Sequence, residues 1–359
     1  MSEPRRGRNR IDGVDAARGF ALIGMFVAHV SPAVASADTA ALIAIADERP
    51  RLLFALTAGI GLGLISGGAR PIVDGRGELL RQIAVRAVIL IALGMLIWAT
   101  LDPLVYIILD VYGVAFLLML PLLFLPPRAA LALGIALLVV TPALAELGTR
   151  TSLAEAVRQT PFRFLSDWIF GGAYPVIVWV PVMLIGLALA RMDLTSPRMI
   201  GMTALAGAAA ASVFLPIASR LPPEAEGEAG WSVPLRASLE TLGNVGVGAL
   251  VVAALLVLTA LAPPAMRSVA GTVLSPVTAM GSMPLSIYTI HLVVISLAIR
   301  VEDGVPTDDS WALLAGLIVG SMVFAWLWRR YLGRGPLERL LRRASGRERA
   351  GAAGAAADG

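Results

Sequence analysis

Long apolar blocks dominate the chain and restrict it to one broad class of fold. A membrane-spanning α-helix needs about 20 mostly apolar residues, and blocks of this length recur along the sequence. Hydrophobic residues make up 57% of the chain and charged residues 15%, whereas soluble domains carry about 25% charged residues. The sequence therefore predicts an all-α polytopic transmembrane bundle of about ten spans. The expected spans are 14–33, 51–67, 82–100, 103–125, 129–146, 174–190, 199–217, 239–262, 276–299 and 311–331.

The arginines predict the orientation of these spans. Every basic residue is an arginine; with a cytoplasmic N-terminus, 21 of the 29 fall inside and 29 − 21 = 8 fall outside. This bias follows the positive-inside rule, so both termini are expected to be cytoplasmic. A cleaved signal peptide ending near Ala35-Ser36-Ala37 is the alternative, although Asp15, Arg18 and His29 would interrupt its apolar core.

Three regions follow from this reading. Residues 1–13 form a basic cytoplasmic tail, 14–332 the transmembrane helical domain, and 333–359 a cytoplasmic tail that is first basic and then Ala/Gly-rich. The basic charge is a topology signal, so we expect membrane lipids and no nucleic acid as partners. Cysteine and lysine are both absent, which excludes thiolate and lysine Schiff-base chemistry. No metal site is expected, and the location is a bacterial cytoplasmic (inner) membrane.

The first span carries three ionisable residues that hydrocarbon tolerates badly, and such residues are functional candidates. Arg18 and His29 are eleven residues apart, which places them about 20° apart around a helix and about 16 Å apart along it. Asp15 is one turn before Arg18 and can pair with it. We expect Arg18 near the cytoplasmic face and His29 in the outer half of the membrane.

Three further polar residues are expected at the depth of His29. His291 lies in the ninth predicted span, Asp110 near the outer end of the fourth, and Asn244 near the outer start of the eighth. The sequence thus predicts one polar layer in the outer half. The structural alternatives are an interhelical hydrogen bond for His29, a purely structural role for Asp110, a helix-bridging amide for Asn244 and a helix-end ion pair for Asp15 and Arg18. The glycines of 59–63 are expected to allow close helix packing.

Several motifs resemble known families. Asp15, Arg18-Gly19 and His29 resemble the first-helix motif of the acyltransferase-3 family. Other stretches resemble the heparan-α-glucosaminide N-acetyltransferase superfamily and its YeiB-type bacterial members, and together the matches run from residue 10 to residue 343. These stretches are Phe54-Ala-Leu-Thr-Ala-Gly-Ile-Gly61, Asp110-Val-Tyr-Gly113, Gly281-Ser-Met-Pro-Leu-Ser-Ile-Tyr-Thr-Ile-His291 and Gly335-Pro-Leu-Glu338.

The resemblance implies a helical bundle that moves an acyl group from cytoplasmic acyl-CoA to an acceptor on the far side. It also implies that Arg18 and His29 matter for the chemistry. One departure is important: the heparan enzymes have asparagine at the position of His29 and a catalytic histidine in the following outer loop. Residues 31–49 of this chain contain no histidine, so the acceptor and the acyl-enzyme details of those enzymes do not carry over.

The leading hypothesis is an acyltransferase that uses acyl-CoA, with acetyl-CoA as the expected donor. The acceptor is a hydroxyl or amine on a glycan, lipid or other envelope component at the outer face. The alternatives are a proton-coupled transporter or flippase of a small polar or lipid-linked substrate, and a non-catalytic membrane scaffold; a homo-oligomer is left open. The expected catalytic residues are His29 as the base, with Asp110 or His291 to orient it. The expected substrate-binding residues are Asp15, Arg18, Arg81, Arg86, Asn244 and Tyr288, of which the three arginines would attract the phosphates of acyl-CoA.

Overall fold

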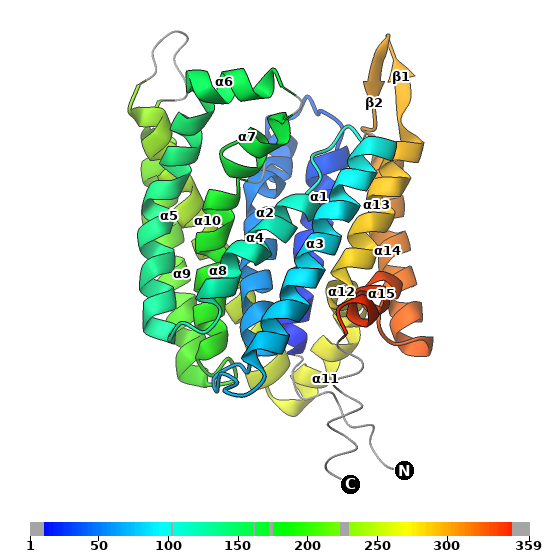
Figure 1. Cartoon of the computed structure of the whole chain (residues 1–359). Coiled ribbons are helices and arrows are strands. Elements are labelled where there is room, and N and C mark those ends of the chain that lie inside the picture. Colours follow the sequence, from blue (N-terminus) through cyan, green and yellow to red (C-terminus); the bar gives the residue numbers. More distant parts are fainter. Residues whose placement is uncertain (1–10, 102, 161, 172–174, 223–229, 347–359) are drawn as a thin grey trace.

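A computed structural model describes residues 11–101, 103–160, 162–171, 175–222 and 230–346. The described residues form a bundle of fifteen α-helices with a 3₁₀ turn, a π-helical turn and one small hairpin (Figure 1). Most of the two predicted tails lies outside these residues, so the division into three regions stays a prediction. The helices are α1 (Asp12–Val30), α2 (Ala37–Ile65), α3 (Arg76–Leu101), α4 (Leu109–Met119), α5 (Pro127–Thr149), α6 (Ser152–Arg158), α7 (Arg163–Ile169), α8 (Val176–Arg191), α9 (Pro197–Arg220), α10 (Ser232–Leu256), α11 (Pro264–Val273), α12 (Ser275–Ser282), α13 (Pro284–Ala298), α14 (Trp311–Tyr331) and α15 (Pro336–Ala344).

The helical bundle expected from the apolar blocks is confirmed. Among the described residues, six helices are long and apolar enough to cross a membrane: α1, α3, α5, α9, α14, and α10 with the π-helical turn Val257–Leu261. The pair α12 and α13 makes a seventh span if it is counted as one helix bent by 91°. Helix α8 and the segment Leu109–Leu122 are apolar but shorter. The count of ten spans therefore stays a prediction.

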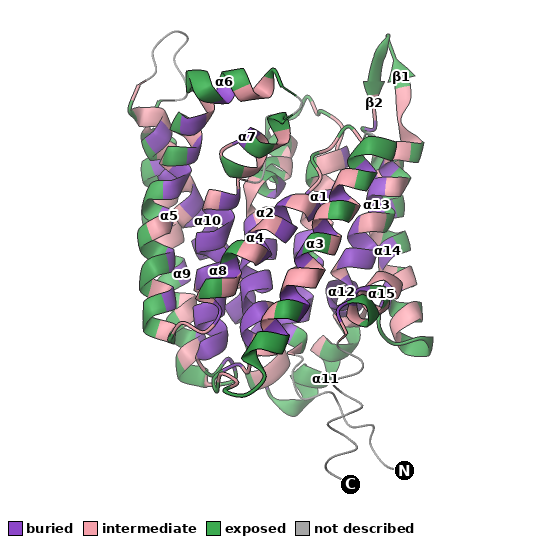
Figure 2. Cartoon of the chain, in the orientation of Figure 1, coloured by how far each residue is buried: buried purple, intermediate pink, exposed green. Residues whose placement is uncertain are grey.

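Helix α1 lies at the centre of the bundle. In its most apolar stretch 61% of the residues are buried, against 11% in α9 and 22% in α14. Figure 2 shows the buried residues concentrated along the inner helices, while the outer helices alternate between buried and exposed positions. The apolar outer surfaces of α9 and α14 are those expected to face lipid, because lipid tails are as apolar as the side chains there.

Helix α2 begins earlier than the sequence predicted. The predicted span started at residue 51, but the helix starts at Ala37, where the Ser36 hydroxyl accepts a hydrogen bond from the Thr39 N–H at 3.4 Å. The helix continues through Pro50, whose ring packs where a Cβ atom on Gly24 of α1 would lie. Residues 47–50, which lie before the predicted span, are therefore helical as well.

Helices α2 and α8 are in backbone contact. A Cβ atom on Gly59 would overlap the Met183 carbonyl, and one on Gly186 would overlap the Leu56 carbonyl. Only glycine permits this approach, and such small-residue contacts are a common basis of helix association in membranes. The structure thus gives Gly59 the packing role that the sequence favoured.

A small hairpin follows α13 in a segment that the sequence predicted as an acidic outer loop. Strands β1 (Arg300–Glu302) and β2 (Val305–Thr307) pair antiparallel. Asp303 and Gly304 both have positive φ angles, 52° and 82°, as a type I′ turn requires. Three-residue strands are too short to give an alternating pattern, which is why the sequence did not reveal them.

The two ends of the bundle can be named by the residues of α1. The Arg329 guanidinium at the end of α14 lies 3.7 Å from the Asp12 carboxylate, so α1 begins where α14 ends; we call this the Arg18 end. At the opposite, His29 end, the Ser310 N–H donates to the Val30 carbonyl at 2.9 Å. Which end faces the cytoplasm stays a prediction from the arginine distribution.

Candidate active site

The two histidines of the chain are in contact. His29, from the last turn of α1, and His291, from the middle of α13, have stacked rings with centroids 5.4 Å apart and planes inclined by 15°. The Nδ1 atom of His29 lies 3.2 Å from the Nε2 atom of His291. The sequence predicted that they share a depth and gave His291 and Asp110 as alternative partners of His29, and the fold brings His291 to it.

Hydrogen bonds assign the ring protons of a neutral pair. The Nδ1 atom of His291 lies 2.6 Å from the Tyr288 carbonyl oxygen, which can only accept, so this nitrogen carries the proton. The Nε2 atom of His291 then accepts from the Nδ1–H of His29. By elimination, the Nε2 atom of His29 carries the lone pair and is the basic nitrogen of the pair.

Aromatic side chains surround the buried member of the pair. His291 is fully buried; the Phe26 ring lies 4.9 Å from it and the Tyr288 ring 4.6 Å, edge-on. The Tyr288 hydroxyl accepts from the Ile108 N–H at 3.0 Å and contacts the Tyr106 carbonyl at 3.4 Å. Tyr288 thus joins α13 to the segment before α4, and its predicted role in substrate binding stays a prediction.

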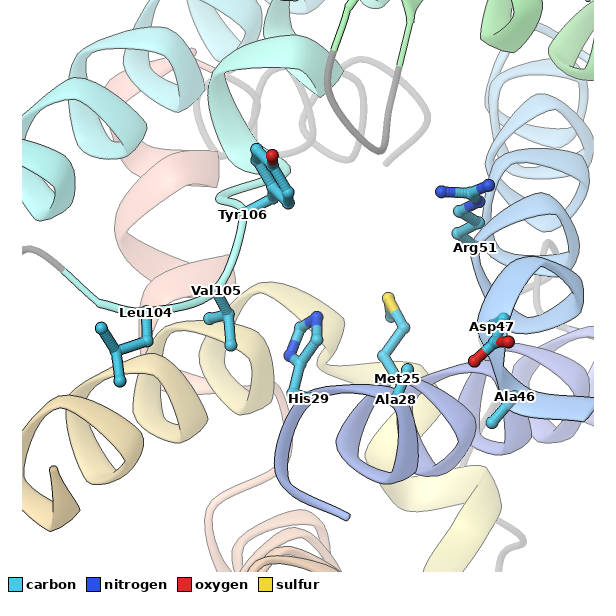
Figure 3. Close-up of a pocket in the computed structure, with 9 residues that line it drawn as sticks. All are labelled: Met25, Ala28, His29, Ala46, Asp47, Arg51, Leu104, Val105 and Tyr106. Atoms are coloured by element: carbon cyan, nitrogen blue, oxygen red, sulfur yellow. The ribbon is translucent and has the colours of Figure 1, made fainter. Parts of the chain in front are cut away.

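His29, in contrast, lines a cavity at its end of the bundle. The cavity has a volume of about 300 Å³, near the lower limit for sites that bind small molecules. In Figure 3 the His29 and Met25 side chains point into it from α1, Arg51 reaches toward it from α2, and Tyr106 lies across from them. The lining residues are Met25, Ala28, His29, Ala46, Asp47, Arg51, Leu104, Val105 and Tyr106.

Asp47 and Arg51 are site residues that the sequence reading missed. They are four residues apart on α2, a spacing that puts both on one face of a helix. The Arg51 guanidinium pairs with the Glu48 carboxylate at 3.0 Å. The available signal was this i, i+3 and i, i+4 spacing of opposite charges, which is typical of a helix but begins before the predicted span at residue 51.

Asn244 belongs to this charged network and not to the histidine pair. Its amide donates to Glu48 at 2.7 Å and its carbonyl oxygen accepts from Arg49 at 3.1 Å. The buried amide thus ties α10 to the charged run of α2. This is the helix-bridging role that the sequence gave as the structural alternative.

Asp110 also has a different partner from the one expected. The Trp168 indole, on α7, donates to its Oδ2 atom at 2.7 Å. Its Oδ1 atom is buried without a hydrogen-bond partner among the described residues. Asp110 therefore connects α4 to the segment between α5 and α8, and its predicted pairing with His29 is absent from the contacts of the described residues.

At the other end of α1, Arg18 joins three helices. Its guanidinium donates to the Asp15 carboxylate at 3.2 Å, as the sequence predicted. It also donates to the Thr57 carbonyl of α2 at 2.8 Å and to the Gly281 carbonyl of α12 at 3.2 Å. These contacts give Arg18 a structural role beside the substrate-binding role that was predicted.

The other two predicted phosphate-binding arginines differ in exposure. Arg81 is exposed and forms two hydrogen bonds with Glu78, at 2.9 and 2.7 Å. Arg86 is partly buried, its guanidinium lies over the Phe116 ring at 5.7 Å, and its Nε atom has no partner among the described residues. Arg81 is thus the one of the two that a large polar ligand could reach from solvent.

No set of three or more His, Cys, Asp or Glu side chains in the described part of the chain is arranged to hold a metal ion.

The buried Arg191 is a further residue that the sequence did not single out. It donates to the Ser66 and Gly68 carbonyls, the Ser66 hydroxyl and the Leu123 carbonyl, at 3.3, 2.8, 2.8 and 2.7 Å. These hydrogen bonds hold the loops at the Arg18 end together, whereas the histidine pair lies toward the opposite end of the bundle.

Comparison with known proteins places this geometry in a family. The model described as heparan-alpha-glucosaminide N-acetyltransferase, catalytic, matches residues 10–219, which include α1 and the cavity wall formed by α2. A model described as a protein of unknown function (DUF418) matches residues 187–348, which include His291. No curated protein matches the chain. The first match covers more than half of the chain, which therefore belongs to the heparan-alpha-glucosaminide N-acetyltransferase catalytic family.

Proposed function

We propose that the chain is an integral-membrane acyltransferase that moves an acyl group, with acetyl expected, from acyl-CoA to a hydroxyl or amine. The observation that carries the proposal is His29, which lines a cavity while its ring is paired with a buried second histidine. Membership in an acetyltransferase family supports the reaction class. The acceptor is an envelope glycan or lipid, and the Arg18 end faces the cytoplasm.

The reaction requires a base at the cavity. The Nε2 atom of His29 takes the proton from the acceptor hydroxyl or amine, whose oxygen or nitrogen then bonds to the thioester carbonyl carbon. The carbon–sulfur bond breaks, and the leaving CoA thiolate takes the proton back from His29. His291 stabilises the transient imidazolium, because its Nε2 atom accepts a hydrogen bond from the Nδ1–H of His29.

Other cavity residues have supporting roles in this proposal. Arg51 and Asp47 lie on the same wall and offer hydrogen-bond donors and acceptors to the acceptor molecule. Arg81, exposed at the opposite end, attracts the phosphates of acyl-CoA. A direct transfer and a transient acyl group on His29 both use the same basic nitrogen.

The test is acyl transfer by the purified protein in liposomes, with labelled acetyl-CoA and a panel of glycan and lipid acceptors. Removing a general base costs about 10²–10⁴-fold in rate, so His29→Ala should reduce transfer by this factor. Ser219→Ala, which alters an exposed hydroxyl on α9, is the control and should retain the full rate. Transfer that survives His29→Ala removes His29 from the mechanism, and proton-coupled uptake without acetyl-CoA consumption favours a transporter instead.

A further inference from the structure

The break between α12 and α13 leaves two opposite helix ends inside the bundle. Helix α12 ends at Ser282, α13 begins at Pro284, and their axes are bent by 91°. The last turn of α12 presents carbonyl groups and a partial negative charge, and the first turn of α13 presents N–H groups and a partial positive charge. Groups of this kind need partners where water is scarce.

Each helix end is contacted by a side chain of the opposite charge. Arg18 donates to the Gly281 carbonyl at the end of α12. Glu338, in the first turn of α15, accepts from the Ser286 N–H at 3.1 Å and from the Ser286 hydroxyl at 2.5 Å. The Ser286 hydroxyl in turn accepts from the Leu337 N–H at 3.1 Å. Glu338 therefore caps α13 in the way that a local side chain usually caps its own helix.

The turn before α15 is shaped for this contact. Gly333 has a positive φ of 83°, and the Trp328 indole fixes the next residue by donating to the Arg334 carbonyl at 2.8 Å. A Cβ atom on Gly335 would overlap both the Glu338 carboxylate and the Ser286 hydroxyl. In Figure 1, α15 lies beside α12 at the base of α13 and α14. The short helix is thus held directly against the start of α13.

Helix α13 carries this contact to the histidine pair. Its N-terminal residue Pro284 and His291 are 291 − 284 = 7 residues apart, which is about 10 Å along a helix. A tilt of about 5° at the break would therefore move the His291 backbone by roughly 1 Å, and a misplacement of about 1 Å can cost about 10²-fold in rate. The charges of the Arg86 guanidinium and the Glu338 carboxylate attract each other, which helps to hold Glu338 in place.

We propose that Glu338 is a positioning residue: its carboxylate fixes the direction of α13 and thereby holds His291 against His29. Helix α15, at the Arg18 end, then controls the geometry of the histidine pair toward the other end of the bundle. The geometric part stands without any assigned reaction, and only its effect on rate rests on the proposed acyltransferase function.

The direct test is ¹⁵N NMR of the histidine rings in untagged protein reconstituted in nanodiscs. The chain contains two histidines, so a histidine-labelled sample gives two rings, which the spectrum of His29→Gln assigns. The native protein should show one protonated and one unprotonated nitrogen in each ring. Glu338→Ala and Gly335→Ala should average these signals, Glu338→Asp should restore part of the separation, and Glu155→Ala, at an exposed carboxylate on α6, should leave them unchanged.

Ring signals of Glu338→Ala identical to those of the native protein overturn the proposal. If Glu338→Ala does not fold, Ser286→Ala and Gly335→Ala decide, and unchanged signals in both overturn it. Acetyl transfer is measured on the same samples, and Glu338→Ala should lower kcat by about 10²-fold with KM for acetyl-CoA retained. If the native protein transfers no acyl group while Glu338→Ala still alters the ring signals, the acyltransferase proposal is refuted and the positioning role stands.

Discussion

Replacing Arg18 separates a structural role from a ligand-binding one. In Arg18→Met the Thr57 and Gly281 carbonyls, on two different helices, lose their charged donor. Hydrogen bonds to charged groups contribute about 1.5–3 kcal/mol each, so the two together predict a loss of about 3–6 kcal/mol in the free energy of unfolding. The Arg18 side chain is only 14% exposed, so water replaces little of this. Arg18→Lys keeps the charge without the forked geometry and should lose about half as much.

The assay is equilibrium unfolding in mixed detergent and SDS micelles, with acetyl-CoA binding measured by calorimetry on the same proteins. Arg158→Met is the control, because Arg158 forms a 3.7 Å surface pair with Glu155 that should contribute about 0–1 kcal/mol. An Arg18→Met protein with native stability but no acetyl-CoA binding would refute the structural reasoning. It would instead support the substrate-binding role that the sequence suggested.

Two further predictions concern stability. Arg191→Met leaves three backbone carbonyls without their donor and, at about 1.5–3 kcal/mol each, should cost about 4.5–9 kcal/mol in the same unfolding assay. Arg191→Lys should recover part of this loss, and a native-like Arg191→Met would contradict the reasoning. Burial raises the pKa of the Asp308 carboxyl, so ionising it destabilises the folded state. Asp308→Asn should therefore be the more stable protein at pH 7, and the difference should vanish as the pH falls below the ordinary carboxyl range; a difference that does not change with pH excludes this cause.

The sequence predicted the shared depth of the two histidines, but it did not predict which helix faces meet. The helical rise is constant, so residue numbers alone brought His29 and His291 to one depth. Which face of a helix points where depends on packing between helices. Asp110 and Asn244 were assigned to the same layer as the histidines, but they meet Trp168 and Glu48 instead.

The start of α2 shows the same limit. Charged residues end an apolar block, so the predicted span began at 51 and left Asp47 and Glu48 outside it. In the fold, the Ser36 cap and the pairing of Glu48 with Arg51 and Asn244 allow the helix to extend past the apolar block. The contact of Glu48 with Asn244 joins residues nearly two hundred positions apart, which composition in a window cannot reveal.

The glycine contact between α2 and α8 decides which part of the molecule can rearrange. Backbones that touch at Gly59 and Gly186 have no intervening side chains whose rotamers could change, so a rotation of either helix at this point would press the two backbones together. Arg51 and the cavity wall on α2 are consequently fixed to the α8 side. A change that widens the cavity for a bulky molecule is therefore expected on the opposite side, where Leu104, Val105 and Tyr106 lie in a segment without regular structure.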